Sequence, residues 1–130
     1  MEGFDTRRPR VVIAEGHRLY REGLVALLRE AENCVLVGIA KDVTSLAACV
    51  DAGTPDILIA DDELAAEEGF AAVAGNFPTI ILEHHPIPPG RTYSVVPASK
   101  LRKTAAFEDL VLEIAKIAGS IRNAKPQNNV

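Results

Sequence analysis

The sequence predicts an α/β fold in which helices cover both faces of a parallel sheet. Short apolar runs alternate with segments whose apolar residues recur every three or four positions, the pattern of repeated strand–helix–strand units. The run Ile57–Ala60 is apolar at every position and is followed by Asp61 and Asp62. Such a run without alternation indicates a strand buried on both faces. A length of 130 residues with 48% hydrophobic residues favours one domain with a substantial core.

Composition excludes several classes of function. The formal net charge of -4 and an aromatic content of 5% argue against direct nucleic-acid binding by this segment. The two cysteines, Cys34 and Cys49, do not form a disulfide framework or a metal cluster, and we expect buried, reduced thiols. No apolar run approaches the length of a membrane span, and the polar start at Met1–Arg10 lacks a secretory signal. We therefore expect a cytoplasmic protein without membrane contact.

The first half of the chain contains two strand–helix pairs. We predict a buried strand at Arg10–Ala14 and a helix at Arg18–Ala31, ended by Asn33. A second strand follows at Cys34–Ala40, and Asp42 is expected to cap a helix that ends at Gly53. The predicted apolar stripe of the first helix comprises Leu19, Tyr20, Leu24, Leu27 and Leu28.

The middle of the chain continues the alternation. After the strand at Ile57–Ala60, a third helix is predicted at Glu63–Ala74, weakened in its middle by Gly69. A fourth strand is predicted at Thr79–Leu82 and ends at Glu83. Residues 84–98 contain four prolines and cannot form a regular helix.

The end of the chain is predicted to hold a short edge strand and a long helix. Ser99–Lys103 is a weak, polar strand that only the edge of a sheet tolerates, and Tyr93–Val96 could form a short extended segment before it. The last helix starts at Thr104, and its buried stripe comprises Phe107, Leu110, Val111, Ile114, Ile117 and Ile121. We expect a disordered segment at residues 1–9, a folded domain at 10–122, and a tail or linker at 123–130.

Three segments carry a resemblance to a known family. Val12–Leu24, with Glu15 directly after the first strand, Pro55–Asp61, and Leu101–Leu110, with Lys103, together resemble a response-regulator receiver domain of the CheY-like, NarL/FixJ type. The resemblance covers about Arg10 to Ala118. It implies a flavodoxin-like, five-stranded parallel sheet in the order 2-1-3-4-5.

The resemblance also implies a chemistry. A histidine kinase would phosphorylate the aspartate that matches Asp61, with Mg²⁺ held by an acidic pair and by that aspartate. Lys103 matches the family lysine and follows Glu83 by 20 residues, the spacing that the resemblance requires. A last strand at Tyr93–Pro97 would instead lose this lysine. No nucleophile–base pair or phosphate-binding glycine loop is present, so we expect no independent enzyme.

The match to the family site is incomplete. Glu15 matches the first member of the acidic pair, but Gly16 replaces the second, which leaves at most a weak metal site at Glu15 and Asp61. Glu83 occupies the position of a threonine or serine, where a carboxylate repels a phosphoryl group by about 4 kcal/mol at 4 Å and a dielectric of 20. A proline-rich loop replaces the fourth helix. We therefore expect an acidic pocket of Glu15, Asp61 and Glu83, with Lys103 paired to Asp61 and Glu83.

These features predict an atypical signal receiver that regulates an output, expected to be transcriptional, through protein contacts with weak or no phosphorylation. Its partners would be a histidine kinase or another signalling protein, a second copy of the chain, and a DNA-binding output domain outside this chain. One alternative is a degenerate receiver that serves only as a dimerisation or docking scaffold. Another is a flavodoxin-like metal-binding domain that uses Glu83, His84 and His85 with Asp61 and Glu15, although adjacent histidines point in opposite directions on an extended chain.

Two simpler interpretations remain for single residues. Asp61 could act only as a solvated cap of the following helix. Lys103 could be an ordinary edge-strand lysine, which protects a sheet from pairing with another chain.

Overall fold

The computed structural model describes residues 7–124 and contains one five-stranded sheet. The strand order is β2-β1-β3-β4-β5, and every neighbouring pair is parallel. This arrangement confirms the predicted fold class and strand order. The strands are β1 (Arg10–Ala14), β2 (Val35–Ala40), β3 (Ile57–Asp61), β4 (Thr79–Glu83) and β5 (Ser99–Arg102).

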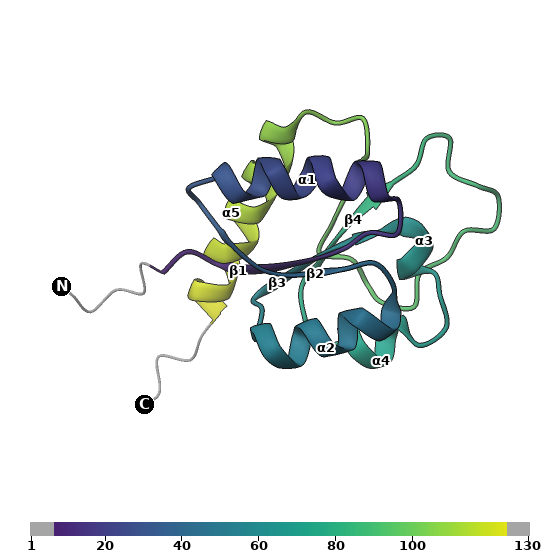
Figure 1. Cartoon of the computed structure of the whole chain (residues 1–130), viewed down its shortest axis with the longest axis horizontal. Coiled ribbons are helices and arrows are strands. Elements are labelled where there is room, and N and C mark those ends of the chain that lie inside the picture. Colours follow the sequence, from purple (N-terminus) through teal and green to yellow (C-terminus); the bar gives the residue numbers. More distant parts are fainter. Residues whose placement is uncertain (1–6, 125–130) are drawn as a thin grey trace.

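Helices cover both faces of the sheet (Figure 1). Helices α1 (Arg18–Glu30) and α5 (Phe107–Ala124) lie on one face. The other face carries α2 (Val43–Gly53), α3 (Asp62–Ala65) and α4 (Phe70–Ala74). Parallel neighbours require crossover connections, and the helices in these connections cover the sheet.

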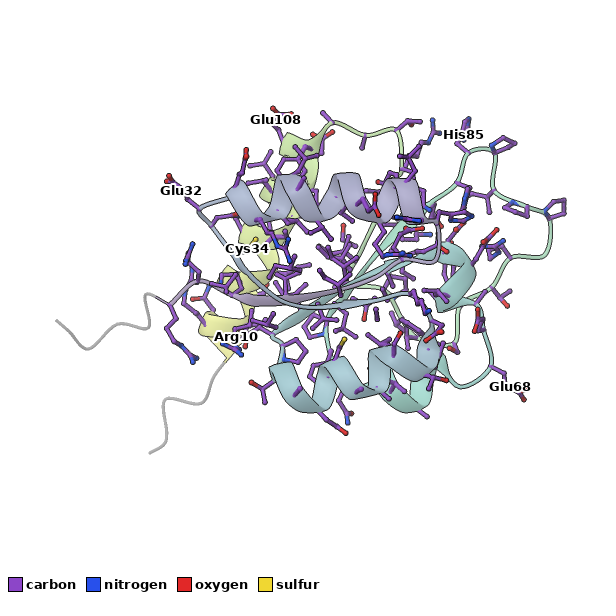
Figure 2. All side chains as sticks on the ribbon, in the orientation of Figure 1. Arg10, Glu32, Cys34, Glu68, His85 and Glu108 are labelled. Atoms are coloured by element: carbon purple, nitrogen blue, oxygen red, sulfur yellow. The ribbon has the colours of Figure 1, made fainter. Side chains whose placement is uncertain are left out.

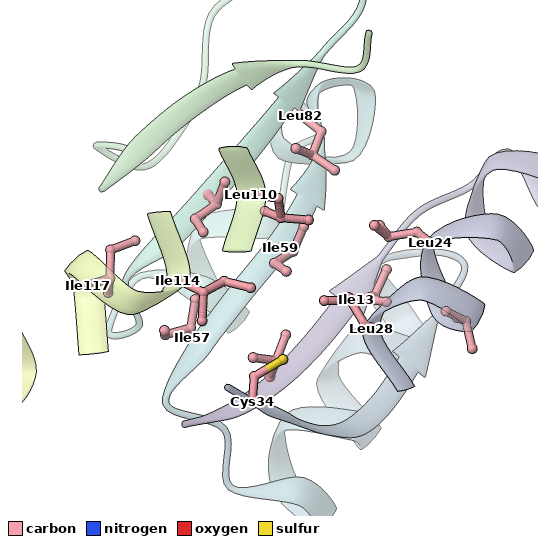
Figure 3. Close-up of a cluster of buried hydrophobic side chains, with 13 residues drawn as sticks. Ile13, Leu24, Leu28, Cys34, Ile57, Ile59, Leu82, Leu110, Ile114 and Ile117 are labelled. Atoms are coloured by element: carbon pink, nitrogen blue, oxygen red, sulfur yellow. The ribbon is translucent and has the colours of Figure 1, made fainter. Parts of the chain in front are cut away.

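The strands divide their side chains between two apolar clusters. Val11 and Ile13 of β1 face α1 and α5, whereas Val12 and Ala14 face α2, α3 and α4. Figure 3 shows the first cluster, where Ile57 and Ile59 of β3 pack beside Ile114 of α5. The central strands β1 and β3 are thus buried on both faces, which explains their unbroken apolar runs.

Helix α2 begins at the cap that its sequence predicts. The Asp42 side chain accepts a hydrogen bond from the backbone N–H of Ser45, and the Ser45 hydroxyl reaches back to the Asp42 N–H. This capping box satisfies two N–H groups that have no partner within the helix. The predicted N-cap is therefore confirmed.

The third helix departs from the prediction. Glu63–Ala74 was expected to be continuous, but α3 ends at Ala65 and α4 starts at Phe70. Between them, Gly69 takes a φ of 95°, a left-handed conformation that is incompatible with a continuing helix. The break lets Phe70 bury its ring fully in the second cluster.

Helices α1 and α5 differ from the prediction at their ends. The predicted inward stripe of α1 is wrong at Leu19 and Leu27, whose exposed fractions are 86% and 47%. Helix α1 ends at Glu30 with Ala31 as its C-cap, so Asn33 lies beyond it. Helix α5 starts at Phe107, three residues after the expected Thr104, because residues 103–105 form a turn.

Residues 84–98 form neither a helix nor a strand. This confirms that a loop occupies the place of the family's fourth helix, and the rival last strand at Tyr93–Pro97 is wrong because β5 is Ser99–Arg102. The edge strand β5 pairs with β4, and the pairing extends to a hydrogen bond from the Lys103 N–H to the Glu83 carbonyl, 2.8 Å. The register that keeps Lys103 next to the end of β4 is therefore correct.

The predicted domain limits are only partly within the described residues. Residues 1–6 and 125–130 lie outside them. Pro9, predicted to be disordered, accepts a backbone hydrogen bond from Val35 at 2.9 Å, and Asn123, predicted to start the tail, belongs to α5. None of the helices in residues 7–124 combines the length and the apolar character needed to cross a membrane.

Both cysteines are free thiols. Cys34 is buried, as predicted, and burial raises the pKa of its thiol. Cys49 is only partly buried, so the prediction of a buried thiol is wrong there.

Candidate functional site

The carboxyl ends of four strands bring charged side chains to one edge of the sheet. Ala14 pairs with Ala60 and Asp61 pairs with Leu82 in the parallel ladders, so Glu15 follows β1 where Asp61 ends β3. Lys103 follows β5 directly beside Glu83 of β4. Open α/β sheets place ligands in the crevice at this edge.

Lys103 lies between two buried carboxylates. Its Nζ is 2.7 Å from Asp61 Oδ1 and 3.1 Å from Glu15 Oε2. The Lys103 side chain is only 12% exposed, and its ammonium also lies 4.7 Å from the centre of the Tyr20 ring. Burial alone would lower the pKa of Lys103, but the hydrogen bonds and charges of Asp61 and Glu15 outweigh it and raise that pKa. The cluster therefore holds Lys103 as a cation.

The anionic form of Asp61 is disfavoured in spite of its ion pair with Lys103. Desolvation is the largest influence on the pKa of Asp61 and raises it, whereas the hydrogen bond and the charge of Lys103 lower it. The negative charges of Glu15 and Asp62 add to the upward shift. Within residues 7–124, Glu15 Oε1 has no hydrogen-bond partner, whereas Asp61 Oδ1 forms the 2.7 Å ion pair with Lys103.

Glu83 does not pair with Lys103, contrary to the expectation. Its Oε2 instead accepts a hydrogen bond of 2.5 Å from the Tyr93 hydroxyl. Tyr93 belongs to the loop at residues 84–98, which therefore reaches back to Glu83, while Lys103 contacts Glu15 and Asp61. Burial and the hydrogen bond to Glu83 raise the pKa of Tyr93, which keeps the phenol protonated as a donor.

Asp62 is a fourth buried carboxylate that the sequence-based prediction did not include. Its Oδ1 accepts a hydrogen bond from His84 Nδ1 at 2.6 Å, and its Oδ2 lies 3.1 Å from Arg91 Nη1. Its Oδ2 also accepts a hydrogen bond from the His84 backbone N–H, 3.2 Å. Burial would raise the pKa of Asp62, but the hydrogen bonds from His84 and the charge of Arg91 lower it overall.

The structure thus brings Glu15, Asp61 and Lys103 into direct contact, with Glu83 at the same edge. The residues that sequence reasoning missed are Asp62, Arg91 and Tyr93. An available signal was the second aspartate after a buried strand, because a buried acid requires a cationic partner. His84 joins the site through Asp62, while His85 projects outward from the loop (Figure 2).

An apolar groove of about 570 Å³ adjoins this cluster. It lies between α1 and the segment that links β5 to α5, and Leu19 and Phe107 are among its lining residues. Lys103 and His17 form its polar end. Leu19 lines this groove and is 86% exposed, because none of the helices and strands in residues 7–124 covers its side chain.

Comparison with solved structures identifies the fold. The signal receiver domain of the response regulator NarL from Mycobacterium tuberculosis is 26% identical, with a TM-score of 0.63, 92% of this chain covered and 99% of that chain. The receiver domain of a modulated diguanylate cyclase from Desulfovibrio desulfuricans is 23% identical, with a TM-score of 0.71 and coverages of 88% and 96%. This chain has the receiver-domain fold.

A third similar structure points the same way. A LuxR-family DNA-binding response regulator from Staphylococcus aureus superimposes with a TM-score of 0.66 at 19% identity, over 84% of this chain and 98% of that chain. No protein-family model and no curated protein sequence matches this chain. The similarity to receiver domains is therefore expressed in the fold more than in the sequence.

The Mg²⁺ site that a receiver domain implies does not fit these residues. Hard cations need several oxygen ligands, and Gly16 offers no carboxylate beside Glu15. The Lys103 ammonium already lies between Glu15 and Asp61, where Mg²⁺ would otherwise supply the positive charge. Between Glu15 and Asp61, these residues thus favour the Lys103 ammonium over Mg²⁺.

Proposed function

We propose that this chain is an atypical signal-receiver domain that acts through protein contacts and does not depend on phosphorylation of Asp61. The observation that carries the proposal is the 2.7 Å ion pair between Lys103 and Asp61 at the carboxyl end of the central strand. This pair gives the receiver fold a fixed cluster at the position where a phosphoryl group would otherwise bind.

Two neighbouring positions support the same proposal. Gly16 removes an acidic ligand, which weakens Mg²⁺ binding and thus the charge neutralisation that phosphoryl transfer requires. Glu83 adds a buried carboxylate, which the hydrogen bond from the Tyr93 hydroxyl holds in place. A phosphoryl group on Asp61 would lie at the same end of the sheet as this carboxylate, and like charges repel.

The partners follow from the class of protein. A histidine kinase or another signalling protein would supply the input by docking, and the domain itself would have no enzymatic activity. The similar structures include a protein described as a LuxR-family DNA-binding response regulator, which supports a transcriptional output. The net charge of -4 argues against DNA contact by this segment itself.

The apolar groove favours a second candidate function, a dimerisation scaffold. Leu19 and Leu27 are exposed along α1 beside the groove, and large apolar side chains in a hollow are typical of protein interfaces. A second copy of the chain that buries this surface would form a dimer. Sedimentation velocity should then show a dimer that Leu19→Ser weakens and Leu112→Ser, at an exposed site outside the groove, does not.

Phosphorylation can be tested directly. The chain is incubated with acetyl phosphate and Mg²⁺, and its intact mass is measured beside a receiver domain that has the full acidic pair. We expect the positive control to gain a phosphoryl group and this chain to keep its mass. A phosphoryl adduct that is lost in Asp61→Ala would overturn the proposal.

A further inference from the structure

Two histidines from different loops meet at the mouth of the cleft. His17 precedes α1, and His84 follows β4. Their ring centres are 5.2 Å apart in an edge-to-face arrangement. The exposed carboxylate of Glu63, in the first turn of α3, lies 3.6 Å from His17 Nε2. Three strand ends therefore contribute one metal-ligating side chain each.

Both imidazoles are oriented by buried carboxylates. His17 Nδ1 is 3.0 Å from Glu15 Oε2, and His84 Nδ1 is 2.6 Å from Asp62 Oδ1. Lys103 Nζ is also near His17 Nδ1, but at 3.5 Å it is farther than the carboxylate, so the Nδ1 proton is donated to Glu15. A proton on Nδ1 leaves Nε2 with a free lone pair, the arrangement found in histidines that bind metals.

We propose that His17, His84 and Glu63 bind a transition-metal dication of the zinc class through the two Nε2 atoms and the carboxylate. One ligand atom from each residue lies within 4.8 Å of the others. Bonds of about 2 Å to a tetrahedral ion require ligand atoms on the order of 3.3 Å apart, so small side-chain rotations complete the site. The three side chains are partly exposed, which leaves the fourth position to water.

The donor set and the local charge select the ion. Two imidazoles and one carboxylate suit Zn²⁺ and similar ions, whereas Mg²⁺ and Ca²⁺ prefer all-oxygen sites. Around the histidines stand the carboxylates of Glu15, Asp61, Asp62 and Glu63, opposed by the cations Lys103 and Arg91. The excess negative charge favours a dication. This site uses neither Asp61 nor Lys103 as a ligand and does not rest on the proposed function.

An ion at this position would connect three segments of the chain. It would join the β1–α1 loop, the start of α3 and the segment at residues 84–98, which has no regular structure of its own. Because an ion that binds only the folded chain stabilises it by mass action, Zn²⁺ should raise the unfolding temperature. It should also slow amide exchange in residues 84–98.

The test is a calorimetric titration of Zn²⁺ into the whole chain, freed of metal and of any histidine tag. We expect one ion per chain, unaffected by excess Mg²⁺. His17→Ala, His84→Ala and Glu63→Gln should each weaken binding at least about tenfold, and Asp62→Asn should weaken it by about the same factor through His84. His85→Ala and Glu68→Gln are the matched controls, since His85 and Glu68 are exposed residues outside the cluster, and both should bind like the parent.

The Co²⁺ form provides an independent readout, because tetrahedral coordination gives strong visible absorption that weak surface binding does not. These bands should appear in the parent and disappear in Glu63→Gln. Glu63 is exposed, so this variant keeps the fold even if His84→Ala does not. The proposal is overturned if the parent binds no Zn²⁺, or if His85→Ala weakens binding as much as His17→Ala does.

Discussion

Asp61 and Asp62 are adjacent buried carboxylates that are held by different cations. Lys103 lies 2.7 Å from Asp61, whereas Arg91 lies 3.1 Å from Asp62, which also accepts a 2.6 Å hydrogen bond from His84. Desolvation is the largest influence on both pKa values, but it prevails only for Asp61, whose pKa is raised. For Asp62 the hydrogen bonds and charges prevail, and the pKa is lowered.

These opposite shifts predict opposite effects of two isosteric substitutions. At pH 7, in the presence of a chelator, Asp61→Asn should increase the free energy of unfolding, because it removes an anion that folding disfavours. Asp62→Asn should decrease it by about 2 kcal/mol, the order for lost hydrogen bonds to a charged group. Urea unfolding of the two variants measures both effects, and a destabilised Asp61→Asn variant would contradict the first.

The same shifts give a pH dependence. A lowered folded pKa means that the contribution of Asp62 is complete above about pH 4, the unfolded value, and is lost as the pH falls through the folded pKa. A raised folded pKa means that Asp61 contributes stability below about pH 4 and loses it as the pH rises through the folded value. Between pH 7 and pH 3, the stability of Asp62→Asn should therefore fall less than that of the parent.

The Tyr93–Glu83 hydrogen bond anchors the loop at residues 84–98. Tyr93→Phe removes only the hydroxyl group and keeps the ring. It leaves the buried Glu83 carboxylate without the 2.5 Å hydrogen bond. We expect a loss of about 2 kcal/mol and faster amide exchange across the loop. Val96→Ser, at a position that is 94% exposed, is the control and should change neither quantity.

Two glycines should respond to alanine in opposite directions. Gly69 has a φ of 95°, so Gly69→Ala should cost about 1 kcal/mol even though no atom would touch the added methyl group. Gly23 lies within α1 with open space around it, and Gly23→Ala should stabilise the chain by about 0.5 to 1 kcal/mol. Thermal unfolding of the pair tests the break between α3 and α4, because a continuous helix would make both substitutions stabilising.

Restoring the missing site residues should restore phosphorylation. A Cβ atom at position 16 would meet only the Lys41 carbonyl oxygen at 3.5 Å, an ordinary contact, so the backbone there can carry a side chain. We expect the double variant Gly16→Asp, Glu83→Thr to gain a phosphoryl group from acetyl phosphate with Mg²⁺. Adding Asp61→Ala should abolish that gain. A double variant that folds but stays unmodified would show that the two positions do not explain the loss.

The sheet and the positions of Glu15, Asp61, Glu83 and Lys103 could be predicted because they depend on local patterns. Unbroken apolar runs identify β1, β3 and β4, and the spacing between Glu83 and Lys103 locates the edge strand. Asp61 follows from its place at the end of β3. These features require only the periodicity of a strand and the parallel order of a sheet.

The partners of Glu83 and Asp62 could not be predicted in this way. Tyr93, Arg91 and His84 come from a proline-rich loop without periodicity, and only its path over the sheet edge decides which carboxylate each one meets. Leu19 illustrates the same limit on a helix. Its spacing places it on the apolar stripe, but the first turn of α1 extends beside an open groove.

A double-mutant cycle on Lys103 and Asp61 tests the fixed ion cluster most directly. The free energies of unfolding of the parent, Lys103→Met, Asp61→Asn and the double variant are measured at pH 7 with a chelator. We predict that Lys103→Met alone costs about 3 kcal/mol, since it leaves buried carboxylates without their cation, and that the coupling energy is at least about 1 kcal/mol. Additive effects of the two substitutions, with no coupling, would contradict the ion pair.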